Sequence, residues 1–188
     1  MGLNRRFWRR EGAREKIFQK NLRTYLTDRN SYYIGVAMSY VANRMSRAEF
    51  DAKIHSFVGR CRQAGLRVTP QRLAIYKELL GSDEHPSAEM LYEKLKAAWP
   101  TLSLDTVNRT VLTLSEIGAA YIVEGSGGAR RFDAGLEHHQ HFKCVKCGKI
   151  VDFHYEPFDE IQLPPAMARR FRVLRKTVYV EGLCDSCK

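Results

Sequence analysis

The segment HHQHFKCVKCGKIVDF at residues 138–153 places three histidines, two cysteines and an aspartate within sixteen positions. Cys144 and Cys147 form one Cys-x-x-Cys pair, and Cys184 and Cys187 form a second pair further along the chain. Two such pairs supply four thiolates, which is the tetrahedral sulfur set that zinc prefers in closed structural sites. We therefore predict a structural Zn²⁺ site built from these four cysteines.

The spacing of the two pairs predicts what lies between them. Cys147 and Cys184 are separated by 36 residues, whereas common zinc ribbons use about 15–20. We expect strands near Phe142 and at 149–153, a helix at 157–163 and a long strand at 172–181, so that zinc clamps the C-terminal segment onto a sheet. A redox dithiol, or cysteines without a common ligand, is the alternative.

The histidines before the first cysteine pair predict a second metal site. If residues 142–144 continue an extended strand, His139 and His141 lie on one face while His138 points away. Other side chains with suitable donor atoms are Asp133, Asp152 and His85. Imidazoles mixed with carboxylates suit iron(II), manganese(II) or zinc.

Residues 49–118 read as four helices. Apolar residues at spacings of three and four predict helices at 49–64, 69–81, 87–99 and 103–118. Cys61 fits the apolar stripe of the first helix, so we assign it to the core and not to a metal site. Two short β-like runs, at 120–124 and 129–132, are joined by a glycine-rich turn. Four helices followed by a two-stranded ribbon describe a winged helix.

The fourth predicted helix has the features of a DNA-reading helix. Leu104, Val107, Val111 and Leu114 are expected to face the core, which leaves a polar stripe on the opposite side. Residues near the N-terminus of such a helix touch base edges in the major groove, although an ordinary solvated face has the same pattern. The predicted DNA contacts are Arg60, Arg67 and Arg72 to phosphates and Thr106, Asn108, Arg109 and Thr113 on the helix.

The composition is that of a globular protein, and the basic residues are concentrated near the N-terminus. The 188 residues are 44% hydrophobic with a formal net charge of +10, and residues 1–44 hold ten Lys/Arg against three Asp/Glu. We read residues 1–44 as a flexible extension or a mis-assigned start, with a phosphate-contacting arm as the alternative. No apolar run reaches the roughly 18 residues of a membrane span. Cysteine pairs that bind metal suit a reducing compartment, so we expect a cytoplasmic protein.

Four motifs, in the same order, resemble the ferric uptake regulator family. They are GLRVTPQR at 65–72, HPSA at 85–88, the histidine–cysteine segment at 138–153 and CDSC at 184–187. The resemblance covers about residues 49–188 and implies an α+β fold. It implies an N-terminal winged-helix DNA-binding domain at 45–133, then a small α/β dimerisation domain with the four-cysteine zinc site at 134–188. It also implies a homodimer that binds a palindromic operator in double-stranded DNA when a regulatory metal is bound.

The resemblance also implies roles for the second metal site. The matching regulatory ligands are His85, Asp133, His139, His141 and Asp152, which would hold Fe²⁺ or Mn²⁺. Aspartate at both carboxylate positions is similar to the peroxide-responsive (PerR-like) branch. In that branch hydrogen peroxide is the signal: iron-catalysed oxidation of a ligand histidine, here His85 or His139, lowers metal affinity and releases DNA. A ligand is consumed once, so this is sensing by a repressor and not enzymatic turnover.

One position departs from the family pattern. Asn108 stands in the fourth helix where the family usually has tyrosine, and because asparagine can bond adenine bidentately, the departure predicts a shifted operator sequence or a weaker affinity. Three other functions remain open at this point: an iron- or manganese-responsive repressor without peroxide sensing, a thiol–disulfide enzyme, and a zinc-ribbon binding module.

Overall fold

The computed structural model of the chain describes residues 45–123, 128–137, 139–174 and 176–188. The expectations for residues 1–44, for most of the glycine-rich turn and for His138 lie outside the described residues. The elements, in chain order, are α3 (Arg47–Gln63), α4 (Pro70–Leu80), α5 (Ala88–Leu95), α6 (Leu104–Glu116), β1 (Tyr121–Val123), β2 (Arg131–Asp133), β3 (Gln140–Cys144), β4 (Ile150–Phe153), α7 (Glu156–Asp159), α8 (Pro165–Arg170) and β5 (Tyr179–Gly182). Helices and strands are thus mixed as the sequence predicts.

The first four helices begin at side chains that cap them. Ser46 and Glu49 form a reciprocal capping box at the start of α3, with bonds of 2.7 and 3.2 Å. Thr69, Ser87 and Ser103 each accept a backbone N–H from the first turn of α4, α5 and α6. Such caps satisfy N–H groups that have no partner inside the helix. The predicted starts of α4, α5 and α6 are confirmed, whereas α3 begins two residues before the predicted start at residue 49 because Ser46 caps it.

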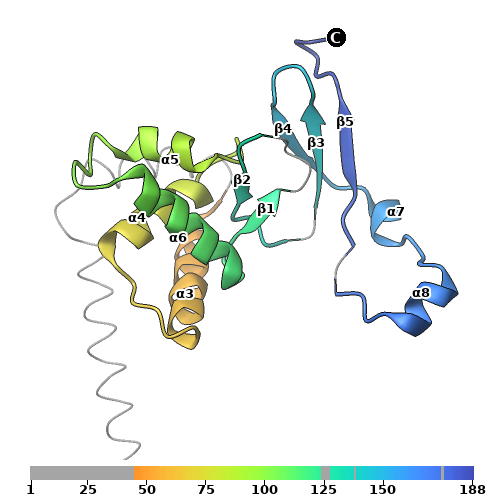
Figure 1. Ribbon diagram of the computed structural model, residues 1–188, viewed down its shortest axis with the longest axis horizontal. Helices are drawn as coiled ribbons and strands as arrows, with labels where there is room; N and C mark the ends of the chain where they lie inside the picture. Colours follow the sequence, from red (N-terminus) through yellow and green to blue (C-terminus); the bar gives the residue numbers. More distant parts are fainter. Residues whose placement is uncertain (1–44, 124–127, 138, 175) are drawn as a thin grey trace, which may run out of the picture.

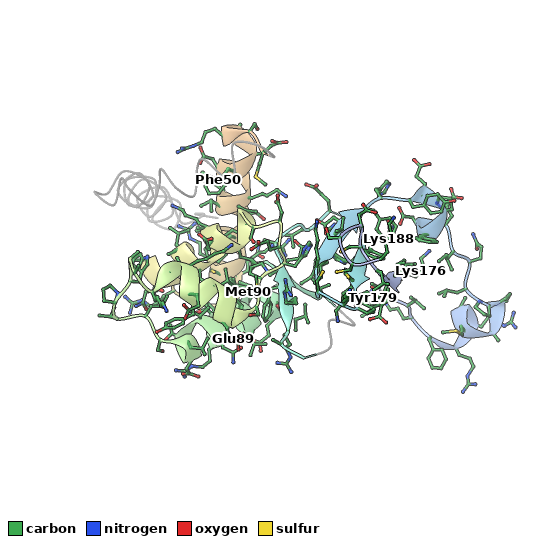
Figure 2. All side chains as sticks on the ribbon, turned by 90° about the horizontal axis from the view of Figure 1, so that it is seen from above. Phe50, Glu89, Met90, Lys176, Tyr179 and Lys188 are labelled. Carbon is green, nitrogen blue, oxygen red and sulfur yellow. The ribbon has the colours of Figure 1, made fainter. Side chains whose placement is uncertain are left out.

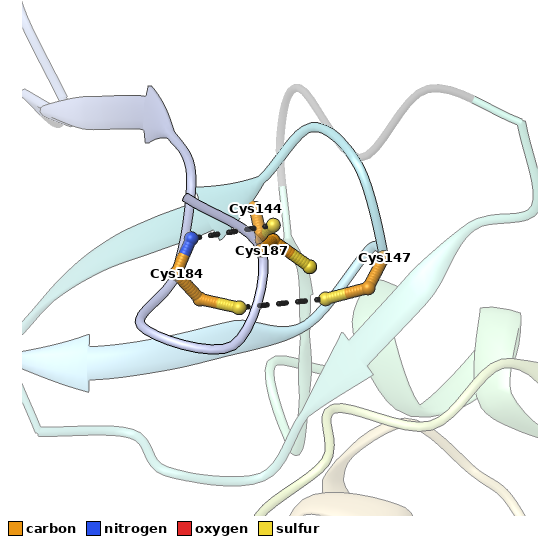
Figure 3. A group of neighbouring side chains, drawn as sticks. All are labelled: Cys144, Cys147, Cys184 and Cys187. Atoms are coloured by element: carbon orange, nitrogen blue, oxygen red, sulfur yellow. Dashed lines mark hydrogen bonds between the residues drawn. The ribbon is translucent and has the colours of Figure 1, made fainter.

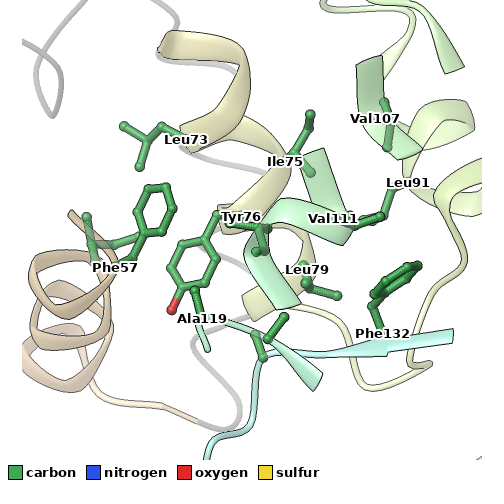
Figure 4. Packing of buried hydrophobic residues seen from close by; sticks show 14 of the residues in the cluster. Phe57, Leu73, Ile75, Tyr76, Leu79, Leu91, Val107, Val111, Ala119 and Phe132 are labelled. Atoms are coloured by element: carbon green, nitrogen blue, oxygen red, sulfur yellow. The ribbon is translucent and has the colours of Figure 1, made fainter. Parts of the chain in front are cut away.

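The main hydrophobic core lies among α3, α4, α5, α6 and the β1–β2 ribbon. Figure 4 shows Phe132 of β2 pointing toward the helices that carry Leu79 and Leu91. Phe57 of α3 stacks on Tyr76 of α4 with ring centroids 4.3 Å apart. Cys61 is fully buried in this core, as predicted, and it belongs to neither of the two potential metal groups among the described residues.

The predicted buried face of α6 is wrong at one position. Leu104 is 38% exposed, whereas Thr110 is only 7% exposed. Residues 107, 110, 111 and 114 follow the i, i+3, i+4, i+7 stripe of a helix that packs along its whole length. Leu104 opens the helix one turn before the packed stripe starts, so it reaches the surface.

The β1–β2 ribbon is shorter than predicted but has the expected antiparallel pairing. Tyr121 pairs with Asp133 and Val123 with Arg131, and each strand has three residues. The N–H of Phe132 also donates to the carbonyl of Pro86 at 3.1 Å. Strand β2 is therefore bonded on one side to β1 and on the other to the loop that precedes α5.

The second sheet has the order β4-β3-β5, with β3 antiparallel to β4 and parallel to β5. Two expectations for this region are wrong. The long strand at 172–181 is limited to β5, because β3 offers partners only for residues 179–182 and an extended segment without a partner forms no sheet. The single helix at 157–163 is replaced by two short helices, α7 and α8, interrupted before Pro164 and Pro165.

The four longer helices and the three-stranded sheet lie on opposite sides of the β1–β2 ribbon, with α7 and α8 beyond the sheet (Figure 1). The view from above places Phe50 and Met90 on the helical side and Lys176 and Tyr179 on the sheet side (Figure 2). Among the described helices, none has the length and apolar character to cross a membrane.

Candidate metal centres

The four paired cysteines converge at one end of the three-stranded sheet. Cys144 is the last residue of β3 and Cys147 follows in the turn, while the segment after β5 carries the other pair. β3 and β5 are parallel, and Cys144 lies opposite Gly182. Both cysteine-bearing turns therefore leave the sheet at the same end of the strands. Figure 3 shows the four side chains directed toward a common centre.

The spacing of the sulfur atoms fits a tetrahedral ion. One ligand atom from each cysteine lies within 4.8 Å of the other three, and the Sγ atoms of Cys147 and Cys184 are 3.7 Å apart. Tetrahedral zinc with bonds of about 2.3 Å separates its sulfur ligands by roughly 3.8 Å. All four are free thiols in one group, which favours a shared metal over two independent redox dithiols.

The environment of Cys144 favours its thiolate. Backbone N–H groups of Cys147 and Cys184 point at its sulfur and lower its pKa to about 6, the second of them at 3.4 Å. By contrast, hydrogen bonding with Cys184 and the other nearby sulfurs raises the pKa of Cys187 to about 12. The cluster therefore cannot hold four negative sulfurs by itself, and a divalent cation supplies the missing positive charge.

The second group is assembled from four segments of the chain. His85 lies in the loop between α4 and α5, Asp133 ends β2, and His139 immediately precedes β3. His141 of β3 stands opposite Asp152 of β4 in the antiparallel ladder. The structure thus brings together all five residues that the sequence singled out for this site, and we call them the His/Asp cluster.

The Nε2 atoms of the three histidines and one oxygen of each aspartate face the same point. Asp133 Oδ2 lies 2.9, 3.7 and 3.9 Å from the Nε2 atoms of His139, His141 and His85. Asp152 Oδ1 lies 2.7, 3.5 and 3.7 Å from those of His85, His141 and His139. The Nε2 atoms of His139 and His141 are 3.1 Å apart. Such mixed imidazole and carboxylate donors suit iron(II), manganese(II) or zinc.

Unsatisfied atoms indicate that a cation belongs in this cluster. Asp133 Oδ2 and Asp152 Oδ1 are buried without a well-formed hydrogen bond, although they face imidazole nitrogens. Buried polar atoms are nearly always satisfied in native proteins, so acceptors gathered around one point fit a metal. Gly135 donates its N–H to the other oxygen of Asp133 at 2.7 Å, which orients the carboxylate toward the centre.

The backbone of His85 is unusual as well. Its φ of 48° is the one positive value outside glycine among the described residues, and its side chain is only 2% exposed. Left-handed backbone in such a residue costs of order 1–3 kcal/mol and persists where the surrounding structure enforces it. The loop thus holds this imidazole inside the cluster against a local preference.

The charges within the cluster are strongly coupled. Burial opposes ionisation of Asp133, but the nearby imidazoles of His139 and His141 outweigh this effect and keep the pKa of the carboxyl below its usual value. In return, the carboxylate of Asp133, 2.9 Å from the ring nitrogen, raises the pKa of His139 to about 9. In the metal-free protein a proton therefore occupies the position that a metal ion would take.

Metal affinity of the His/Asp cluster should accordingly increase with pH. His139 must lose its proton before it can bind a cation, so Mn²⁺ affinity should rise by up to about tenfold per pH unit between pH 6.5 and 9. The stability of the metal-free protein should change in the opposite direction. Because the folded-state pKa of His139 is raised, its contribution is complete below the unfolded value near 6.5 and is lost as pH rises through about 9. Calorimetric titration and melting curves would measure both, and a pH-independent Mn²⁺ affinity would contradict the assignment.

The predicted DNA-contacting residues fall into a group on α6 and a group of three arginines outside it. On α6, Asn108 and Arg109 are exposed, and Arg109 pairs with Asp105 at 2.6 Å, while Thr106 and Thr113 are half-buried. Arg60 is half-buried and donates to the carbonyl of Ile117 at the end of α6 at 3.5 Å. Arg72 donates to the carbonyl of the exposed Arg67. Arg60 thus has a structural partner that its sequence position did not indicate.

Sequence reasoning also missed Gln140, which lies between two members of the His/Asp cluster. Its side chain is 1% exposed, its Nε2 donates to Asp159 at 2.7 Å and its Oε1 accepts the N–H of Tyr155 at 2.9 Å. The alternation of the strand places it on the face opposite His139 and His141. A glutamine on a strand face that becomes buried has no distinctive sequence signal.

Comparison with known proteins agrees with this geometry. Residues 63–181 match the ferric uptake regulator family. The chain belongs to the ferric uptake regulator family. Among curated relatives, a peroxide-responsive repressor, PerR, of Staphylococcus epidermidis is 34% identical over 138 residues, which cover 73% of this chain and 92% of that protein. The family comprises DNA-binding transcription regulators, a class to which this chain accordingly belongs.

Solved structures show the same architecture. The Helicobacter pylori ferric uptake regulator, described as having three functional metal-binding sites, superposes with a TM-score of 0.64 at 23% identity, over 76% of this chain and 97% of that one. The Pseudomonas aeruginosa regulator with manganese superposes with a TM-score of 0.56 at 26% identity, over 68% and 96%. At these identities the first comparison supports the fold alone.

Proposed function

We propose that this protein is a metal-dependent transcriptional repressor that senses hydrogen peroxide. The observation that carries the proposal is the His/Asp cluster, in which three imidazoles and two aspartates converge on one point. The similarity to a staphylococcal repressor named as peroxide-responsive supports the signal. Both carboxylates are aspartates, the feature on which the resemblance to the peroxide-responsive branch rests.

Residues 45–133 form the winged-helix DNA-binding domain in this proposal, and residues 134–188 form the dimerisation domain. The first contributes His85 and Asp133 to the cluster, and the second contributes His139, His141 and Asp152. One ion bound by all five therefore ties the two domains together. The metal ion has a higher affinity for the arrangement in which both domains contribute ligands than for any other arrangement. Metal binding therefore shifts the protein toward that arrangement.

The proposed sensing step uses the same residues. Bound iron(II) supplies the redox chemistry that activates peroxide, whereas manganese(II) in the same place does not. The imidazole of His85 or His139 takes up one oxygen atom, water carries away the other, and the ring no longer serves as a ligand. Loss of one imidazole lowers the affinity for the metal ion. Without the ion the two domains are no longer held in the DNA-binding arrangement, and the protein releases the DNA.

The four-cysteine group serves as a structural zinc site in this proposal. It joins the end of β3 to the segment after β5, and β3 carries His141. Zinc therefore holds the sheet that presents the regulatory ligands without taking part in sensing.

A homodimer that binds a palindromic operator completes the proposal. The described residues of α7 and α8 include no buried side chain, and several apolar side chains are exposed around them. These are Tyr155, Ile161, Met167, Phe171, Val173 and Leu174. Exposed apolar patches on soluble proteins commonly mark interaction sites, and a second copy of this chain is the occupant we propose. A two-fold dimer presents two copies of α6, which is why a palindromic DNA site is expected.

Mass spectrometry after peroxide treatment tests the sensing mechanism. Iron-loaded protein should gain about 16 Da on a peptide that contains His85 or His139, the mass of one added oxygen atom, and should lose affinity for its operator. Manganese-loaded protein serves as the control and should remain unmodified. An unmodified iron-loaded protein that still binds DNA in a metal-dependent way would favour an iron- or manganese-level sensor instead.

A further inference from the structure

Arg131 of β2 contacts the neighbouring loop that carries His85. Its Nε donates to the carbonyl of His85 and its Nη2 donates to the carbonyl of Glu84. The next residue of β2, Phe132, donates its backbone N–H to the carbonyl of Pro86 at 3.1 Å. Three consecutive carbonyls of this loop are thus bonded to two consecutive residues of β2.

These bonds act where the loop has its least favourable conformation. His85 has a φ of 48°, which a residue with a side chain adopts only when the surroundings enforce it. The planar guanidinium has its donors in a fixed fork, so two of them can hold two adjacent carbonyls in one geometry. The side chain of Arg131 therefore restrains the peptide groups on both sides of the His85 α-carbon.

The position of Arg131 in the ribbon adds a second link. It pairs with Val123 of β1 and lies two residues before Asp133, so β2 contributes a ligand directly and supports another through Arg131. Strand β2 belongs to the ribbon that we assign as the wing. A shift of this strand would consequently move Asp133 and the carbonyls around His85 together.

We propose that Arg131 is a positioning residue that holds His85 in its metal-binding conformation and thereby couples the wing to the regulatory metal. This inference rests on the proposed function, since it assumes that the His/Asp cluster binds a regulatory metal. Arg131 itself touches no metal in this proposal, and it acts through the carbonyls of Glu84 and His85. Residues that orient metal ligands typically change affinity by about 10–100-fold when replaced.

The test is a Mn²⁺ titration of the full chain with its zinc retained, comparing wild type with Arg131→Met, Arg131→Lys and Arg130→Met. Arg131→Met should weaken Mn²⁺ binding by about 10–100-fold. Arg131→Lys should fall in between, because an ammonium group donates hydrogen bonds without the fork. Arg130→Met removes the same charge from the exposed neighbouring position and should bind Mn²⁺ like wild type.

Two further measurements separate positioning from a merely structural role or a direct DNA contact. The melting temperature of the Mn²⁺-free Arg131→Met protein should match that of Arg130→Met, and its operator affinity should recover at saturating Mn²⁺. Equal Mn²⁺ affinities for Arg131→Met and wild type would overturn the inference, as would a DNA defect that saturating Mn²⁺ does not correct. If Arg131→Met does not fold, Arg131→Lys decides by the same criteria. Failure of wild type to bind Mn²⁺ would instead reject the proposed function.

Discussion

The Cys184→Ser variant should lose its zinc and, with it, the fold of the three-stranded sheet. Cys184 belongs to the segment after β5, and its sulfur is 3.7 Å from that of Cys147 in the turn after β3. Among described residues this sheet contributes few fully buried apolar side chains, namely Cys144 and Ile150. Zinc binding supplies about 10–16 kcal/mol of folding free energy in small domains, which exceeds what so small a core provides.

Zinc stoichiometry and thermal melting measure this effect. Wild type should hold one zinc ion per chain in the four-cysteine group, and Cys184→Ser should hold none there and should lose the melting transition of the sheet. Cys61→Ala is the matched control, because Cys61 is buried in the helical core. The Cys61→Ala variant should have a lower free energy of unfolding because of the small cavity it creates, but it should retain its zinc. Native zinc content and melting in Cys184→Ser would rule out a structural zinc site.

The His141→Ala variant should lose regulatory metal while it keeps its zinc. The Nε2 atom of His141 lies 3.1 Å from that of His139 and within 3.7 Å of an oxygen of each aspartate. Removal of this donor leaves both carboxylates with fewer partners. Because residues that only support a ligand are worth about 10–100-fold in affinity, loss of a ligand should cost more than about 100-fold.

Mn²⁺ titration and operator binding in the same samples test this result. His141→Ala should bind operator with a low affinity that Mn²⁺ does not increase, since the tie between the domains is absent. His55→Ala is the control: His55 lies on the exposed side of α3, with its Nδ1 2.7 Å from the carbonyl of Asp51. This variant should behave as wild type in both assays. Operator binding by His141→Ala that still responds to Mn²⁺ would place the regulatory metal elsewhere.

Local features were predictable from the sequence because they depend on residues close together in the chain. The cap Thr69 acts on an N–H group three positions away, and alternation along a strand places His139 and His141 together. The residue type and spacing of the two cysteine pairs likewise predict a zinc site. His85, Asp133 and Asp152 were candidate donors by residue type, and their assignment as ligands is what the family resemblance implies. No local pattern connects His85 to residues about 50 positions away.

Other features required the tertiary structure, because they depend on which segments become neighbours. The start of β5 at Tyr179 depends on where β3 offers pairing partners. The exposure of Leu104 depends on how far the helical core extends along α6. The left-handed backbone of His85 and its support by Arg131 arise from contacts between segments 46 residues apart. The sequence by itself determined which donor atoms are available and how short segments present them. Only the packing of distant segments decided where those atoms meet, because no local interaction carries that information.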